Sequence, residues 1–137
     1  MTYRLTLGLA LIGIGLCLGC SPAFSEATTT VYFIPFDVET YIPVTQADIA
    51  SRAWEQWNIS SHVETTRLIT ILNRGPKQTF DSSKVRCLIV VSSIQTYLID
   101  ANGVVSQANN LGTTLDKAEF EQFRDSLKAG ERVIFHK

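Results

Sequence analysis

Apolar and polar residues follow two different periods along this chain, and each change of period marks the boundary of a predicted element. Alternating or unbroken runs of β-branched, aromatic and aliphatic residues predict strands at 31–36, 84–92, 95–100, 104–107 and 131–136. Residues 37–44 also alternate, so we predict that they continue extended. Pro35 and Pro43 lack the N–H that an inner strand donates, which favours a sheet edge for this region, or a first strand that ends in a bulge at Pro35. The run at 84–92 is apolar on both faces in its second half and is predicted to be central.

Three segments have the helical period, and each opens with a serine or threonine followed three residues later by an acid. The first opens at residues 45–48, and its apolar stripe consists of Ile49, Ala50, Ala53, Trp54 and Trp57. The second opens at residues 61–64 and ends at Gly75, where glycine favours a left-handed cap. The third opens at Thr113 and ends at Gly130.

The order of these elements predicts the fold class. Tight turns such as Asn102-Gly103 join neighbouring strands, and strands joined in this way pair antiparallel. We therefore predict an α+β domain: an antiparallel sheet of about five to six strands, with three helices packed on one face as a second layer. No linker or repeat divides residues 26–137, so they are predicted to form a single domain.

The N-terminal residues have the layout of an export signal. Arg4 precedes an apolar run of fourteen residues, 5–18, and small side chains follow at positions 23 and 25. A membrane-spanning helix needs about 20 apolar residues, so this run is too short to be one. We expect cleavage after residue 25 and a soluble protein in the periplasm or cell envelope.

An alternative fate is lipidation. Leu18-Gly19-Cys20 resembles the end of a bacterial lipoprotein signal, although Cys17 stands where that signal has an aliphatic residue. The resemblance implies a signal of residues 1–19 and an acyl chain on Cys20, which would be the protein's one attachment to a membrane.

Charge excludes one class of partner. Residues after position 25 include eleven bases and thirteen acids, a net charge of −2. A nucleic-acid-binding domain carries a basic surface, so we predict no nucleic-acid partner.

Cys87 is the one cysteine of the predicted domain, lies in an apolar run, and is predicted to be a buried strand residue.

Candidate chemistry is sparse. With two histidines, His62 and His136, and one domain cysteine, no spaced metal-binding cluster is present, and the eight glycines form no phosphate-binding loop. We therefore predict no metal and no cofactor. Asp37 and Glu39 share one face of an extended segment, with Cα atoms roughly 6.5–7 Å apart, a separation that suits a carboxylate pair.

Aromatic residues suggest a binding function. Trp54 and Trp57 continue an apolar stripe, which favours core positions, and partial exposure of one ring is the alternative. With Tyr41, Asp37 and Glu39 they are the candidate contact residues of an exported module that binds another protein, in an inhibitory, immunity-like or assembly role. Two alternatives are a small hydrolase that uses the carboxylates of Asp37, Glu39 and Asp100, and a carrier of a small apolar ligand between sheet and helices.

Overall fold

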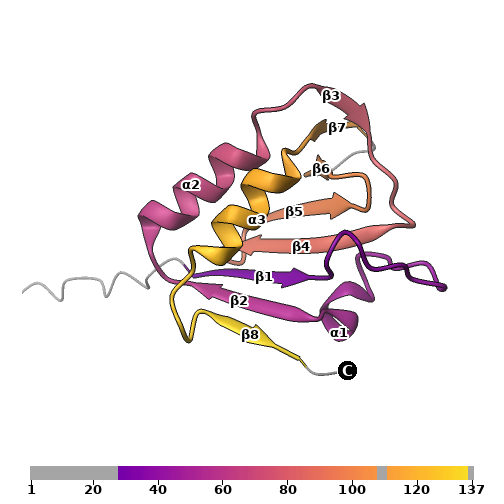
Figure 1. Cartoon of the computed structure of the whole chain (residues 1–137). Helices are drawn as coiled ribbons and strands as arrows, with labels where there is room; N and C mark the ends of the chain where they lie inside the picture. The colour runs from indigo at the N-terminus through magenta and orange to yellow at the C-terminus, as the bar shows by residue number, and fades with distance from the viewer. Residues whose placement is uncertain (1–27, 108–110, 136–137) are drawn as a thin grey trace, which may run out of the picture.

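The computed structural model describes residues 28–107 and 111–135, which form one eight-stranded sheet and three helices (Figure 1). In chain order the elements are β1 (Thr29–Phe33), α1 (Ile49–Arg52), β2 (Glu55–Ile59), α2 (His62–Leu72), β3 (Lys77–Thr79), β4 (Val85–Val91), β5 (Gln95–Asp100), β6 (Val104–Ser106), β7 (Leu111–Thr114), α3 (Lys117–Asp125) and β8 (Arg132–Ile134). The predicted export signal and Cys20 lie outside the described residues. The α+β class and the three helices are as predicted, whereas five to six strands were too few.

The strand order is β3-β7-β6-β5-β4-β1-β2-β8, and all neighbours pair antiparallel. β4 lies between β5 and β1, inside the sheet as predicted. β1 is an inner strand as well, so the edge position predicted for it is wrong. Pro35 lies beyond the end of β1 at Phe33, and it therefore removes no hydrogen bond from the ladder.

The predicted first helix is shorter than its apolar stripe. α1 ends at Arg52, and the chain then forms β2, which pairs with β1 and β8. Alternate residues of β2, namely Glu55, Trp57 and Ile59, are buried. The spacing of Ala53 and Trp57 fits a helix, but it was the pairing with two neighbouring strands that decided the conformation.

Two further strands were not predicted because they are short and polar. β3 and β7 pair with each other across a long separation in sequence, and neither has a strong apolar pattern. Residues 37–44, predicted to be extended, instead form a loop that meets the sheet at one isolated bridge, between Val44 and Lys84.

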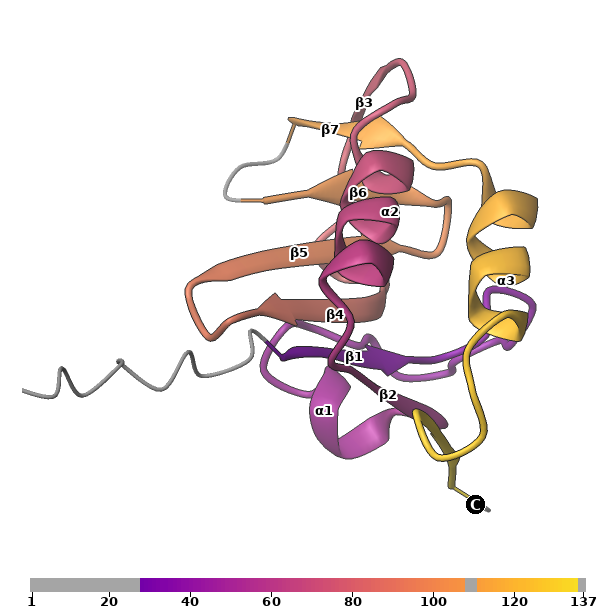
Figure 2. The ribbon, with the colours of Figure 1, turned by 90° about the vertical axis from the view of Figure 1, so that its left-hand side faces the viewer.

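Helices α2 and α3 lie on the same face of the sheet, as Figures 1 and 2 show together. The core beneath them consists of Val31, Phe33, Trp57, Ile59, Leu68, Ile71, Leu72, Cys87, Ile89, Tyr97, Ile99, Val105, Leu115, Phe120 and Phe123. Its centre is aromatic: the rings of Phe33, Trp57 and Phe120 lie 5.4–5.6 Å apart between centroids. These packed rings hold α3 against β1 and β2.

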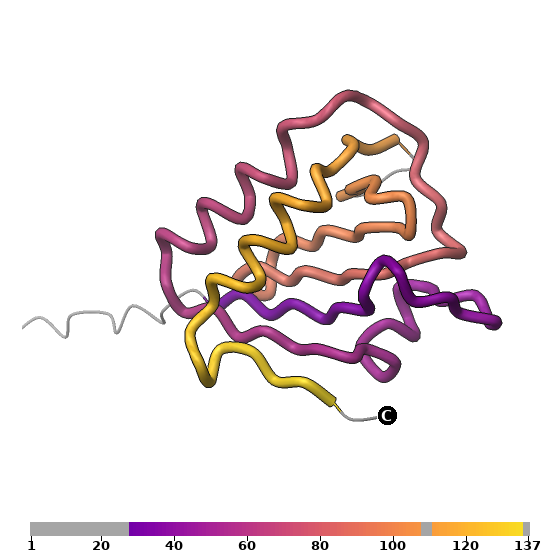
Figure 3. Tube along the Cα trace, in the orientation of Figure 1, coloured from indigo at the N-terminus to yellow at the C-terminus, as the bar shows by residue number. Residues whose placement is uncertain are grey.

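A smaller core covers one end of the opposite face, and it includes Ile34, Val44 and Ile49 of α1. The prediction of helices on one face alone is therefore wrong for α1. Figure 3 shows the chain leaving the end of β1, looping outward and returning to α1 at the end of the sheet where β8 also ends. This arrangement places β8 at the same end of the sheet as the loop between β1 and α1, from which it is distant in sequence.

Side-chain caps fix where the two long helices begin. Ser61 caps α2 by accepting a hydrogen bond from the Glu64 N–H, as the sequence predicted. α3 begins after Asp116, which accepts from the Glu119 N–H, and not after Thr113. Residues 111–114 pair with β6 and β3, and this pairing delays the helix by one turn.

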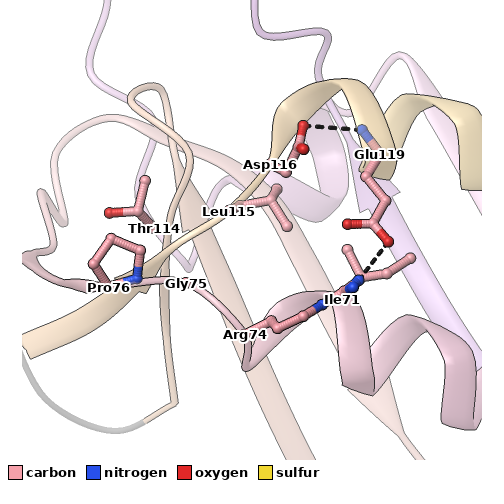
Figure 4. A pocket seen from close by; sticks show the side chains of 8 residues that line it. All are labelled: Ile71, Arg74, Gly75, Pro76, Thr114, Leu115, Asp116 and Glu119. Carbon is pink, nitrogen blue, oxygen red and sulfur yellow. Dashed lines mark hydrogen bonds and ion pairs between the residues drawn. The ribbon is translucent and has the colours of Figure 1, made fainter.

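The predicted left-handed cap at Gly75 is wrong. The positive-φ glycines of the described chain are Gly103 and Gly130, and α2 ends at Leu72 with Asn73 as its cap. Gly75 is required for a different reason: an added Cβ would lie 1.6 Å from the carbonyl oxygen of Thr114. Figure 4 shows these two segments crossing.

We therefore expect Gly75→Ala to lower the free energy of unfolding by about 1–3 kcal/mol, the usual cost of overpacking. The new methyl group must push the end of α2 away from β7, since the obstructing atom belongs to the backbone. Urea denaturation followed by circular dichroism measures the change. An unaltered midpoint and slope would contradict the close approach.

Candidate functional site

The structure places four of the five predicted binding residues at one end of the sheet. Asp37, Glu39 and Tyr41 lie on the segment 35–42, which we call the 35–42 loop, and Trp54 lies between α1 and β2. Two surface hollows border this loop, and both are lined by Asp37 and Val38. The predicted residues therefore belong to one continuous region.

The first hollow, which we call the Trp54 hollow, has a volume of about 480 Å³. It is lined by Pro35, Asp37, Val38, Trp54, Glu121 and Arg124. The second, the Arg86 hollow, has a volume of about 460 Å³. It is lined by Phe36, Asp37, Val38, Glu39, Thr40, Tyr41, Lys84, Arg86, Ala101 and Asn102.

Large apolar side chains are exposed around these hollows. Tyr41 is 97 % exposed and Ile42 is 63 % exposed, while Trp54 retains 41 % of its surface. The carbonyl of Trp54 accepts a hydrogen bond from the N–H of Phe135 at 2.7 Å, which joins this region to the end of β8. Phe135 and Ile134 are exposed as well.

β8 forms one edge of the sheet. Phe135 directs its N–H toward β2, and residues of an antiparallel strand alternate, so the N–H and C=O of Ile134 point away from β2. The other edge strand, β3, is polar throughout, with the sequence Lys-Gln-Thr. Charged and polar side chains protect an edge from pairing, and β8 lacks this protection at Val133 and Ile134.

Trp57 is the exception among the predicted contact residues. It is 0 % exposed, packs against Phe33 and Phe120, and donates its indole N–H to Glu55 at 3.0 Å. A partner cannot reach this ring in the folded protein, so the core interpretation of Trp57 holds and the contact interpretation is wrong.

A buried ion-pair network anchors β8, and sequence reasoning missed it. Glu55 of β2 accepts two hydrogen bonds from the Arg132 guanidinium, both at 2.8 Å, and Arg124 of α3 lies 4.0 Å away. Burial raises the pKa of Glu55, but the hydrogen bonds from Arg132 and Trp57 outweigh it and leave the pKa below its ordinary value. The network therefore keeps Glu55 ionised and ties β8 to β2.

The carboxylates named for hydrolysis are not equivalent. Asp37 and Glu39 are exposed, whereas Asp100 is fully buried. Its two oxygens accept from backbone N–H groups at 2.9 Å, those of Asp81, Asn102 and Val104. Asp100 thus organises the turn into β6.

Burial raises the pKa of Cys87, so its thiol stays protonated and inert as a nucleophile.

A third hollow, of about 390 Å³, lies where α2 ends and α3 begins (Figure 4). Arg74 and Glu119 form an ion pair at its wall, and Asp116 and Thr114 add further polar groups. The space between sheet and helices is itself occupied by the aromatic core. Ile71, Pro76 and Leu115 also line the hollow at the end of α2, so its surface combines apolar and polar groups.

Within residues 28–107 and 111–135, no group of three or more histidine, cysteine, aspartate or glutamate side chains is arranged to hold a metal ion. Over the same residues, no helix combines the length and the apolar character needed to cross a membrane.

Comparison with known proteins gives no relative: no protein-family model, no curated protein and no solved structure matches this chain.

Proposed function

We propose that this chain is an exported protein-binding module of the periplasm or cell envelope, and that its partner is another protein. The contact region is the surface formed by Tyr41, Ile42, Trp54, Ile134 and Phe135, which we call the aromatic end surface. Asp37, which lines both hollows, and Glu39, which lines the Arg86 hollow, add negative charge beside it.

One observation carries this proposal: large aromatic and aliphatic side chains are exposed at one end of the sheet, on the 35–42 loop, at Trp54 and along the unprotected edge strand β8. Tryptophan, tyrosine and phenylalanine are the residue types enriched in protein interfaces. Contiguous exposed apolar surface usually marks an interaction site, because leaving it in water is unfavourable.

The fold supports such a surface. Trp54 and Phe135 are joined backbone to backbone, and β8 is anchored by the buried Glu55–Arg132 pair. Contact residues held on rigid elements lose less conformational entropy on binding than residues on a free tail. The 35–42 loop supplies the most exposed side chain, Tyr41, next to this rigid part.

Site-specific photocrosslinking in the native cell tests the proposal. A photoreactive amino acid at position 41, 54 or 134 is expected to yield the same discrete protein adduct, identified by mass spectrometry. Leu111 on β7, near the opposite edge, is the matched control, because it is also large, apolar and exposed. No adduct at the three test positions, or the same adduct at position 111, would overturn the assignment.

Binding of the purified adduct partner then gives a quantitative check. Trp54→Ala is expected to raise the Kd by about thirtyfold, the effect of losing a contact of about 2 kcal/mol. The control Leu111→Ser is expected to leave the Kd unchanged. Circular dichroism of both variants shows whether the fold is retained.

A further inference from the structure

A buried arginine lies at the base of the Arg86 hollow. Arg86 is 6 % exposed, although it belongs to an otherwise apolar strand. In the ladder between β4 and β5, Val85 pairs with Asp100 and Cys87 pairs with Ile99, which leaves Arg86 as the extra residue of a bulge. A bulge redirects a side chain out of the regular alternation, and bulges are frequent beside functional sites.

The guanidinium of Arg86 is poorly satisfied by the protein. It has five N–H donors, and its two hydrogen bonds are long, at 3.3 Å to the Val85 carbonyl and 3.4 Å to the Val38 carbonyl. Among the described residues its buried Nε–H has no hydrogen-bond partner. Leaving a buried donor unsatisfied is unfavourable, and more so when the group is charged.

The neighbouring acid, Asp100, does not satisfy the guanidinium donors of Arg86. Asp100 attracts Arg86 electrostatically, but its oxygens accept three backbone N–H groups. Burial lowers the pKa of Arg86, and Asp100 opposes this effect only in part. The charge of Arg86 is therefore balanced at a distance, while its Nε–H has no acceptor and its Nη atoms make only long hydrogen bonds.

The other charges of the hollow are arranged by depth. The acids Asp37 and Glu39 are exposed at the rim, and Lys84 is exposed beside them, 3.8 Å from Asp81. Lys117 donates to the Ala101 carbonyl at the same side of the hollow. The rim of the hollow therefore carries both acidic and basic side chains, and the buried Arg86 lies beneath them.

We propose that the Arg86 hollow is a binding site for a carboxylate group, held by the Arg86 guanidinium. The planar arginine fork matches two carboxylate oxygens, and such charge-assisted hydrogen bonds are among the strongest in proteins. Asp37 and Glu39 at the rim disfavour a polyanion, so the carboxylate belongs to a molecule whose remainder is neutral or positive. A free small carboxylate and the C-terminus of a polypeptide share this chemistry. The site adjoins the aromatic end surface, since Asp37, Glu39 and Tyr41 line the hollow, but Arg86 is not part of that surface and the carboxylate site does not depend on its assignment.

The site is tested directly by titrating the purified chain of residues 26–137 and monitoring the Arg86 Nε–H resonance by NMR. The probes are sodium acetate, inorganic phosphate, and the dipeptide acetyl-Ala-Ala as free acid and as amide. Acetate and the free-acid dipeptide are expected to produce saturable shifts, and the amide none. Tighter binding of the free-acid dipeptide than of acetate identifies a polypeptide end as the source, and the reverse identifies a small free carboxylate.

Two variants separate recognition from folding. Arg86→Lys keeps the charge but removes the fork, and the Kd for acetate, followed at the backbone amide of Asn102 in the wall of the hollow, is expected to rise about tenfold, the effect of losing one charge-assisted hydrogen bond. Thr40→Phe fills the hollow from the loop without altering Arg86, and it is expected to abolish the shift even if Arg86→Lys folds poorly. Leu111→Ser serves as the control and should titrate like the wild type.

The proposal is overturned if neither acetate nor the free-acid dipeptide gives a saturable shift, or if phosphate binds as tightly as acetate. It is also overturned if Thr40→Phe leaves the titration unchanged. A failed crosslinking experiment at positions 41, 54 and 134 would refute the protein-binding function and leave this titration unaffected.

Discussion

Replacing Trp57 by alanine is expected to lower the free energy of unfolding by about 3–5 kcal/mol, the range for truncating a large aromatic side chain in a core. The ring is fully buried and contacts Phe33, Phe120 and Phe123. Its removal leaves a cavity between the sheet and α3, and it takes away the indole donor of Glu55. Urea denaturation followed by circular dichroism and tyrosine fluorescence measures the loss.

Trp54→Ala is the matched control, three residues earlier in the chain. Trp54 is 41 % exposed and lies outside both cores, so its removal is expected to cost less than about 1 kcal/mol. The pair of variants thereby separates a core residue from a proposed contact residue of the same type. Equal losses of stability in both would contradict the packing described for Trp57.

Replacing Arg132 by alanine is expected to cost about 2–3 kcal/mol, less than for a fully buried ion pair because the Arg132 side chain is 28 % exposed, but enough to leave the buried Glu55 carboxylate without its strongest donors. Glu55 is 5 % exposed, and without Arg132 its nearest remaining cation is Arg124 at 4.0 Å. The same substitution is expected to loosen β8, because the side-chain hydrogen bonds from Arg132 to Glu55 tie this three-residue edge strand to β2. Hydrogen exchange of the β8 amides, together with urea denaturation, measures both effects.

Arg74→Ala provides the control for an ion pair at the surface. Arg74 pairs with Glu119, and both side chains are substantially exposed to water. Surface pairs contribute about 0–1 kcal/mol because solvent screens them, so this variant should be nearly as stable as the wild type. A loss as large as that of Arg132→Ala would show that burial does not set the strength of these pairs.

The Glu55 network also gives stability a dependence on pH. The pKa of Glu55 is lowered in the folded state, so its stabilising contribution is present above the unfolded pKa, about 4.3, and is lost as the pH falls through the folded value. Glu55→Gln lacks this contribution. The wild type is therefore expected to lose more stability than Glu55→Gln on acidification below about pH 4.3, and parallel curves would contradict the network.

Edge strands show where sequence patterns stop being informative. The edge position inferred from Pro35 was wrong, since the proline stands just past the last ladder residue of β1. A shift of the strand end by one or two residues decides whether a proline interrupts the ladder. The sequence pattern does not locate a strand boundary with that precision. The real edges, β3 and β8, are three residues each and carry little period of their own.

Arg86 shows the same limit at the proposed carboxylate site. A single charged residue in the run Val85–Val91 is a visible anomaly, and in a regular strand it would face away from Cys87. Its burial depends on a bulge in the β4–β5 ladder and on the 35–42 loop folding over that end of the sheet. Both are long-range events, because neither the loop nor β5 is adjacent to Arg86 in sequence.

By itself the sequence determined the α+β class, the two long helices, the central strand β4, the burial of Cys87 and the N-terminal cap of α2. Each of these rests on a local period or on a cap within a few residues. Only the tertiary structure decided that Trp57 belongs to a strand, that β3 and β7 exist, and that Glu55 pairs with Arg132. Those features arise from pairing between distant segments, and the free energy of such pairing outweighs the weak local preferences of the residues involved.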